Sequence, residues 1–206
     1  MTGAPWTVII PVKPSEIGKS RLEVSGVDQV ALRRAIALDT IAAAAAADGV
    51  GRVVIVTDDG GLVIQAIDIP GLRFVSEGDA IGLNEAVAVG AGTAEGMPRA
   101  ALLGDVPSLR SADLSEALRA AASVDRGVVA DEEGTGSTLV TARAGVAWET
   151  AFGDDSFARH VELGCTPLRI ADASTLRRDV DTVEQLRAAA ELGLGRRTAQ
   201  VLRGAL

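Results

Sequence analysis

Hydrophobic residues along the chain alternate between short runs rich in β-branched side chains and longer runs rich in alanine and leucine. The short runs predict strands, because β-branched residues favour extended backbone and a strand covered on both faces is apolar throughout. The predicted strands are Trp6–Val12, Val53–Asp58, Arg73–Ser76, Ala101–Val106, Gly127–Asp131, Thr138–Ala142 and Leu168–Ile170.

The longer runs predict helices, since their apolar residues recur at helical spacing, as Leu32, Ile36 and Ala43 do. The predicted helices are Asp28–Asp48, Leu62–Ile67, Leu83–Glu95, Ala112–Ser123, Ser156–Leu163, Thr182–Leu192 and Arg196–Gly204. Alternating strands and helices indicate an α/β fold with a mostly parallel central sheet and flanking helices. The strands on either side of the glycine-rich turn near residue 135 predict a small antiparallel extension. We expect residues 1–206 to form a single domain.

Composition narrows the class of partners. The 206 residues carry 20 basic and 28 acidic side chains, a net charge of −8. Nucleic-acid binding without sequence preference needs a cation-rich surface, so that class is disfavoured. The single cysteine excludes an internal disulfide and a cysteine-based zinc site. No stretch is long and apolar enough to span a bilayer, and none resembles a signal peptide. We therefore expect a cytoplasmic protein without nucleic-acid or membrane partners.

Lysine is confined to one place in the chain. Only Lys13 and Lys19 occur, at the end of the first predicted strand and in the polar loop after it. With Gly18, Ser20 and Arg21 they could cradle a polyphosphate through cations and backbone amides. The loop is not a Walker A motif, because no glycine stands five residues before Gly18. Chance combined with codon bias against lysine is the alternative explanation.

Carboxylates suited to a metal follow two other segments. Asp105 ends the fourth predicted strand, and Asp179 and Asp181 alternate along an extended segment, where they would face the same way. Together they could hold Mg²⁺ with open positions for phosphate oxygens. The structural alternatives are that Asp105 caps the next turn and that Asp181 caps a helix together with Glu184.

Three further polar segments carry weaker signals. Segments 134–138 and 152–156 offer glycine amides and hydroxyls that could bind an anion, although ordinary turns look the same. Gly82 and Asn84 precede another predicted helix, where Asn84 could simply be the N-cap. The lone histidine, His160, is expected to be a satisfied or solvent-facing residue rather than a catalytic base.

Taken in order, these pieces resemble one enzyme family over essentially the whole chain. The pieces are Pro11–Lys13, Gly18–Leu22, Gly82–Asn84, Gly104–Pro107, Gly134–Ser137, Phe152–His160 and Asp179–Thr182. The resemblance is to the 2-phospho-L-lactate and phosphoenolpyruvate guanylyltransferases of deazaflavin coenzyme F-420 biosynthesis. It implies a GT-A-like nucleotidyltransferase fold, GTP as donor, Mg²⁺ as cofactor and pyrophosphate as by-product. It also implies a downstream transferase that accepts the guanylylated product.

The resemblance assigns roles to particular positions. Transferred onto this sequence, the resemblance makes Asp105, Asp179 and Asp181 the metal ligands, and Ser137, Gly153 and Ser156 the residues that hold the acceptor's carboxylate. It places Lys13, Lys19 and Arg21 opposite the GTP phosphates, and it adds nucleotide contacts by Gly82 and Asn84. Lys13, Lys19 and Asp105 form the catalytic set.

Two departures leave the acceptor open between phosphoenolpyruvate and 2-phospho-L-lactate. Asp154 and Asp155 make the acceptor segment unexpectedly acidic, and Thr138 stands where other members can carry a different residue. Two other functions compete: a nucleotidyltransferase of the sugar-phosphate or molybdopterin type, and a non-catalytic receiver-like phosphate-binding domain. The receiver pattern would need acidic residues after the first strand, where this chain has Lys13.

Overall fold

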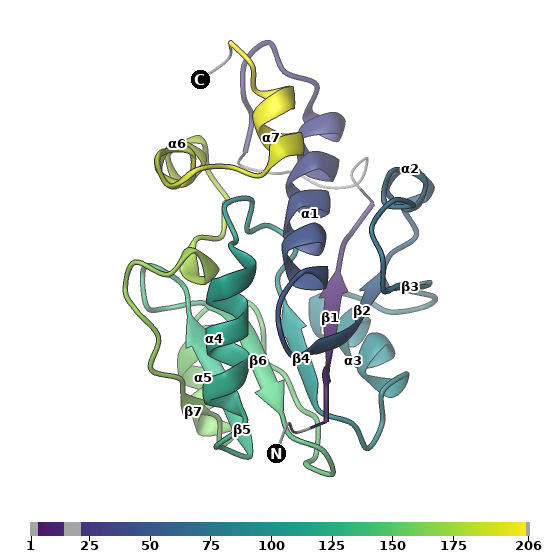
Figure 1. The fold of residues 1–206 in the computed structure, drawn as a ribbon, viewed down its shortest axis with the longest axis vertical. Coiled ribbons are helices and arrows are strands. Elements are labelled where there is room, and N and C mark those ends of the chain that lie inside the picture. The colour runs from purple at the N-terminus through teal and green to yellow at the C-terminus, as the bar shows by residue number, and fades with distance from the viewer. Residues whose placement is uncertain (1–3, 15–21, 205–206) are drawn as a thin grey trace.

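The computed structural model describes residues 4–14 and 22–204, which form one seven-stranded sheet with helices on both faces (Figure 1). Lys19 and Arg21 lie outside the described residues. The strand order is β3-β2-β1-β4-β6-β5-β7. The strands are β1 (Trp6–Pro11), β2 (Val50–Val56), β3 (Leu72–Val75), β4 (Arg99–Leu102), β5 (Arg126–Ala130), β6 (Ser137–Ala142) and β7 (Thr166–Pro167).

Helices connect and cover the strands. They are α1 (Gln29–Ala45), α2 (Gly60–Gln65), α3 (Leu83–Gly92), α4 (Ser111–Ala121), α5 (Ser156–Glu162), α6 (Val183–Leu192) and α7 (Arg196–Val201), with a 3₁₀ turn at Thr175–Arg177. Strand residues point alternately to the two faces. Ile10 and Ile55 pack with residues of α1 and α4, whereas Ile9 and Val54 pack with residues of α3.

Strand direction confirms the mostly parallel sheet. β1 pairs in parallel with β2 and β4, and β2 with β3. The predicted antiparallel pair exists, but it is not peripheral: β6 is antiparallel to both β4 and β5 and joins them inside the sheet. The last predicted strand is displaced, because pairing with β5 is confined to Thr166–Pro167. The Leu168 N–H still donates to the Val128 carbonyl of β5 at 2.8 Å, and the side chains of Leu168 and Ile170 pack against the core.

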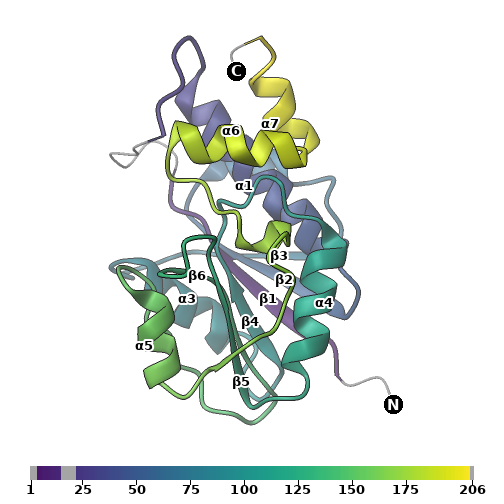
Figure 2. The ribbon, with the colours of Figure 1, turned by 90° about the vertical axis from the view of Figure 1, so that its left-hand side faces the viewer.

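Helix α1 packs against both the central sheet and the C-terminal helices α6 and α7. Asp28 caps its first turn by accepting from the backbone of Val30 and Ala31. Leu38, in its second half, packs on the sheet, while Leu32, near its start, packs with residues of α6 and α7. Figure 2 shows α6 and α7 lying beyond one end of the strands, over the first half of α1.

A buried carboxylate fastens α7 to α1. Asp39 of α1 is 8% exposed and accepts from the backbone N–H groups of Arg197, at 3.1 Å, and Thr198, at 2.7 Å. These are first-turn amides without partners inside their own helix, so Asp39 acts as a long-range cap. The N–H of Gly195 donates to the carbonyl of Pro107 at 2.8 Å, which ties the start of α7 to the loop after β4.

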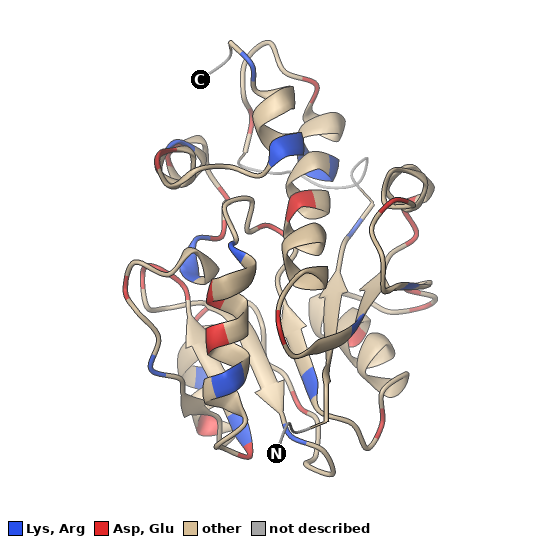
Figure 3. Ribbon diagram, in the orientation of Figure 1, with Lys and Arg blue, Asp and Glu red and all other residues tan. Residues whose placement is uncertain are grey.

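Basic and acidic residues are both spread over the fold (Figure 3). In the view of Figure 3, basic residues are interspersed with acidic residues and do not form one basic region. Within the described ranges, no helix is both long and apolar enough to cross a membrane.

Candidate active site

Topology brings the polar loops to one edge of the sheet. β1, β4 and β5 point the same way, so the residues that follow them, Lys13, Asp105 and Asp131, lie toward the same edge. β6 runs in the opposite direction, so it begins there with Ser137. The Leu103 N–H donates to the carbonyl of Thr138 at 3.0 Å, which fixes the end of β4 beside the start of β6.

The segment that carries Asp179 and Asp181 is pinned against Asp105. The N–H of Val180 donates to the Asp105 carbonyl at 3.0 Å. The Val180 side chain is 4% exposed and packs into the cluster formed with Leu186 of α6. Because neighbours on an extended segment alternate, Asp179 and Asp181 face away from that cluster. The charge of Asp181 acts on Asp105, and the charges of Asp105 and Asp181 act on Asp179, so the three carboxylates proposed from the sequence lie near one another. They are not the trio whose oxygens lie closest together, which is Asp131, Glu133 and Asp179.

Mutual repulsion and burial perturb these carboxylates. Burial, followed by the charge of Asp181, raises the pKa of Asp105 to about 7. Burial, followed by the charges of Asp105 and Asp131, raises the pKa of Asp179 to about 8. Asp105 Oδ1 is buried and has no hydrogen-bond partner among the residues that the structure describes. Asp105 therefore does not cap the next turn through this atom.

Two further acidic residues, which the sequence analysis missed, join the cluster. Carboxylate oxygens of Asp131, Glu133 and Asp179 lie within 4.8 Å of one another. Asp131 also accepts from the amides of Thr135, at 3.0 Å, and Gly136, at 2.7 Å, and so shapes the turn between β5 and β6. The available signal was its position directly after a buried strand. A hard divalent cation fits this all-oxygen donor set and would relieve the repulsion.

Neither Asp181 nor Asn84 caps a helix, so the structural alternative considered for each residue does not apply. The N-cap of α6 is Thr182, whose hydroxyl accepts from Gln185 N–H while the Gln185 side chain accepts from the Thr182 backbone. This leaves the Asp181 carboxylate out of the cap. Asn84 does not cap α3: its amide accepts from Phe152 N–H at 2.8 Å and donates to the Phe152 carbonyl at 3.0 Å. The N-cap of α3 is Gly82, and nucleotide contacts by Gly82 and Asn84 stay predictions.

The ends of β1, β2 and β3 carry charged residues of different kinds. Lys13 is exposed and lies near Glu77, whose pKa is raised by burial and by Asp58 and lowered by Lys13. Asp59, by contrast, is structural: it caps α2 and pairs with Arg34 at 2.8 Å.

Hydroxyl groups gather at the start of β6 and the start of α5. Ser137 and Ser156 are each 2% exposed, and Ser137 Oγ lies 3.0 Å from Nδ1 of His160. Thr138 Oγ1 is buried and lacks a hydrogen-bond partner within the described part of the chain. Gly153 has a φ of +119°, which favours glycine and so constrains the backbone before α5.

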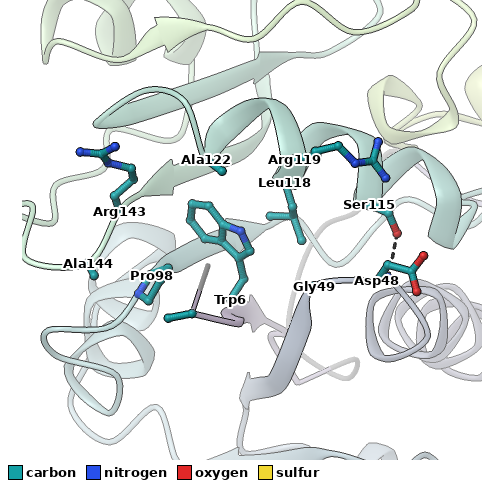
Figure 4. A pocket seen from close by; sticks show the side chains of 11 residues that line it. Trp6, Asp48, Gly49, Pro98, Ser115, Leu118, Arg119, Ala122, Arg143 and Ala144 are labelled. Carbon is teal, nitrogen blue, oxygen red and sulfur yellow. Dashed lines mark hydrogen bonds between the residues drawn. The ribbon is translucent and has the colours of Figure 1, made fainter. Parts of the chain in front are cut away.

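A separate hollow of about 470 Å³ lies elsewhere (Figure 4). Figure 4 shows the Trp6 indole in it, with Arg119 and Arg143 on opposite sides. It sits by the amino end of β1, and its lining includes none of the proposed site residues that the structure describes. The chemistry is therefore expected at the opposite edge of the sheet.

Solved structures with low sequence identity share this architecture. A 4-diphosphocytidyl-2C-methyl-D-erythritol synthase from Anaerococcus prevotii has a TM-score of 0.60 and 15% identity, covering 92% of this chain and 99% of that one. Rv0371c from Mycobacterium tuberculosis, solved with manganese, has a TM-score of 0.56 and 18% identity, covering 91% and 98%. The expected nucleotidyltransferase fold is confirmed.

Curated relatives are much nearer in sequence. A phosphoenolpyruvate guanylyltransferase from Thermomonospora curvata is 44% identical over 199 residues, covering 94% of this chain and 87% of the relative. One from Streptomyces scabiei is 43% identical over 204 residues, covering 94% of each. The family model described as "Guanylyl transferase CofC like" matches residues 6–204. The chain therefore belongs to the CofC-like guanylyl transferase family.

Proposed function

We propose that this guanylyltransferase moves GMP from GTP onto the phosphate of phosphoenolpyruvate, releases pyrophosphate, and acts in coenzyme F-420 biosynthesis. The observation that carries the choice of acceptor is the identity of more than 40% with relatives named phosphoenolpyruvate guanylyltransferase. 2-Phospho-L-lactate, the other acceptor that the sequence left open, becomes an arm of the test. Family membership favours this function over a sugar-phosphate nucleotidyltransferase or a receiver-like domain.

Asp105, Asp179 and Asp181 would hold Mg²⁺. Among the described residues Asp105 Oδ1 is buried without a hydrogen-bond partner, and the pKa values of Asp105 and Asp179 are raised; both features fit a site that binds a cation. The manganese bound to Rv0371c is consistent with a divalent ion in this fold. When bound, the ion supplies positive charge that neutralises and aligns phosphate oxygens.

The chain's own cations share that task. Lys13 is exposed at the end of β1 and is free to approach the GTP phosphates, and Lys19 and Arg21 are proposed to do the same from the following loop. Phosphoryl-transfer enzymes act mainly by positioning and electrostatic stabilisation, because the protein has little covalent chemistry to perform. Neutralising two polyanions is the main requirement here.

No general base is required. A phosphate monoester has its second pKa near 6, so the acceptor is mostly a dianion at neutral pH. One of its oxygens forms a bond to the α-phosphorus of GTP, and the bond from that phosphorus to the bridging oxygen breaks, which releases pyrophosphate. This agrees with a buried His160 whose pKa is lowered to about 4. The acceptor's carboxylate would be held by Ser137, Gly153 and Ser156.

The test is pyrophosphate release from GTP and Mg²⁺ with phosphoenolpyruvate, 2-phospho-L-lactate or 3-phosphoglycerate added singly. The downstream transferase is included to consume the product. Release with phosphoenolpyruvate alone is the expected result. Release only with another acceptor would replace the substrate, and absence of GTP binding would overturn the proposed reaction.

A further inference from the structure

His160 is buried between two segments of the proposed acceptor site. It lies on α5, is 0% exposed, and is the single histidine of the sequence. Its Nδ1 lies 3.0 Å from Ser137 Oγ at the start of β6. Its Nε2 accepts from the backbone N–H of Ala151 at 2.8 Å, two residues before Gly153. One imidazole therefore bridges the two segments.

The backbone contact selects the tautomer. A ring nitrogen that accepts from an N–H carries no hydrogen, and a neutral imidazole then carries its hydrogen on the other nitrogen. His160 is neutral because burial lowers its pKa to about 4; the Ser156 carbonyl opposes the shift, and Arg159 and Arg126 add to it. Nδ1 therefore carries the hydrogen, and in its 3.0 Å contact with Nδ1 the Ser137 oxygen can accept but not donate, while the Ser156 carbonyl is a second acceptor near the ring.

This direction sets what Ser137 can offer to a ligand. Its oxygen accepts from His160, so its own O–H hydrogen is not used in that contact. Within residues 4–14 and 22–204, the Ser137 hydroxyl has no second hydrogen bond. In the opposite tautomer Ser137 would donate to the ring and present only lone pairs, which repel an anion. The Ala151 N–H thus makes Ser137 a donor.

We propose that His160 is a positioning residue for the acceptor: it ties Ser137 to the segment before Gly153 and keeps the Ser137 hydroxyl hydrogen available for the acceptor's carboxylate. The inference rests on the proposed function, because it needs an anionic acceptor beside Ser137. It extends the role of α5 from a scaffold element to one that determines acceptor affinity.

Two substitutions separate the contacts. In His160→Asn the side-chain amide nitrogen can take the place of Nδ1 and still donate to Ser137. In His160→Gln the amide oxygen can take the place of Nε2 and still accept from Ala151, but the donor to Ser137 is lost. We expect His160→Gln to raise the KM for the acceptor about tenfold, as expected when a hydrogen bond to a charged group is weakened. We expect His160→Asn to change it less than about threefold, and the KM for GTP to stay unchanged in both.

A spectroscopic readout on the unmodified protein does not depend on the variants folding. Because the chain has one histidine, its two imidazole nitrogens can be assigned by ¹⁵N NMR. We expect hydrogen on Nδ1 and none on Nε2, unchanged from pH 8 to 5.5. Hydrogen on Nε2, or titration near the ordinary pKa of about 6.5, would overturn the inference.

The outcomes also distinguish the two proposals. If the wild-type protein releases pyrophosphate with none of the acceptors, the proposed function fails and this inference fails with it. If it is active and the two folded variants show the same acceptor KM, only the positioning role of His160 is overturned. Ser137→Ala provides the companion test and is expected to raise the acceptor KM at least as much as His160→Gln.

Discussion

The two sides of the candidate site differ in how well their polar groups are compensated by neighbouring residues. On the carboxylate side (Asp105, Asp131, Asp179 and Asp181) like charges crowd together, and an oxygen of Asp105 is buried without a hydrogen-bond partner among the described residues. On the hydroxyl side (Ser137, Ser156 and His160) both ring nitrogens of the buried histidine are hydrogen-bonded. Buried charge is costly unless it is compensated, so the first side fits a cationic ligand. The hydroxyl side is held in place by hydrogen bonds within the protein.

Removing one carboxylate should produce the largest effect. Asp105→Asn is expected to lower turnover on the order of 10²-fold or more, because bound metal contributes several kcal/mol of charge stabilisation. Steady-state pyrophosphate release measures it, with circular dichroism to show that the fold persists. Asp125→Asn is the control, since Asp125 is exposed and pairs with Arg143. Near-wild-type turnover in Asp105→Asn would refute the metal assignment.

Loosening the support of the carboxylate side should mainly affect stability. In Gly195→Ala the new Cβ would collide with the Asp39 carboxylate that caps α7. We expect a loss of about 1–3 kcal/mol in the free energy of unfolding, the usual cost of overpacking. Urea denaturation measures it. Gly92→Ala is the matched control, because its Cβ would meet open space. Equal stability of the two variants would show that this contact is easily relieved.

Loosening the hydroxyl side should be milder. Asn84 holds both backbone groups of Phe152, which precedes Gly153. Asn84→Ala should cost about 1–2 kcal/mol of stability and raise the acceptor KM several-fold, roughly the effect of losing two ordinary hydrogen bonds. Thermal denaturation and acceptor titration measure these effects. Asn84→Asp keeps the acceptor for Phe152 N–H but turns a carboxylate oxygen towards the Phe152 carbonyl, so it should be at least as damaging as Asn84→Ala. Any other order would contradict the role assigned to this amide.

The two sides should also respond to pH with opposite signs. Asp105 and Asp179 have folded pKa values of about 7 and about 8, above the ordinary carboxyl value, so the folded state binds more protons than the unfolded state. Metal-free protein should therefore lose stability as pH rises from about 4 to 8. Mg²⁺ should raise the melting temperature more at pH 8 than at pH 6, because binding needs ionised ligands. A melting temperature that rises from pH 6.5 to 8 without metal would contradict this.

His160 should add the reverse dependence. Its folded pKa of about 4 lies below the unfolded value of about 6.5, so the unfolded state binds the extra proton. Its contribution to stability is complete above pH 6.5 and is lost as pH falls towards 4. Comparing the wild type with His160→Asn separates this effect from that of the carboxylates. The variant should lose less stability than the wild type as pH falls from about 6.5 to about 4. An unchanged acid-side loss would indicate that other groups dominate it.

The elements were predictable because they follow from local pattern. The apolar runs near Ile10, Val54 and Leu102 locate buried strands, and Asp28 marks the start of α1. The displaced β7 and the place of β6 inside the sheet were not predictable, since pairing partners lie far apart in the chain. The sequence left open whether Asn84 and Asp181 cap α3 and α6, because a polar residue near a helix start can serve as a cap or have another role; the N-caps are Gly82 and Thr182. Only the folded chain shows which ones are used.

The sequence by itself determined the residue types of the site: two lysines near the first strand, aspartates after apolar segments, and hydroxyls beside glycines. It also carried the family resemblance, which the comparisons confirm. The tertiary structure decided which groups meet. It placed Asp131 and Glu133 beside Asp179, used Asn84 to hold Phe152, and set the His160 tautomer through Ala151. Hydrogen-bond direction and carboxylate repulsion depend on distances of a few ångströms between segments distant in sequence, which only packing fixes.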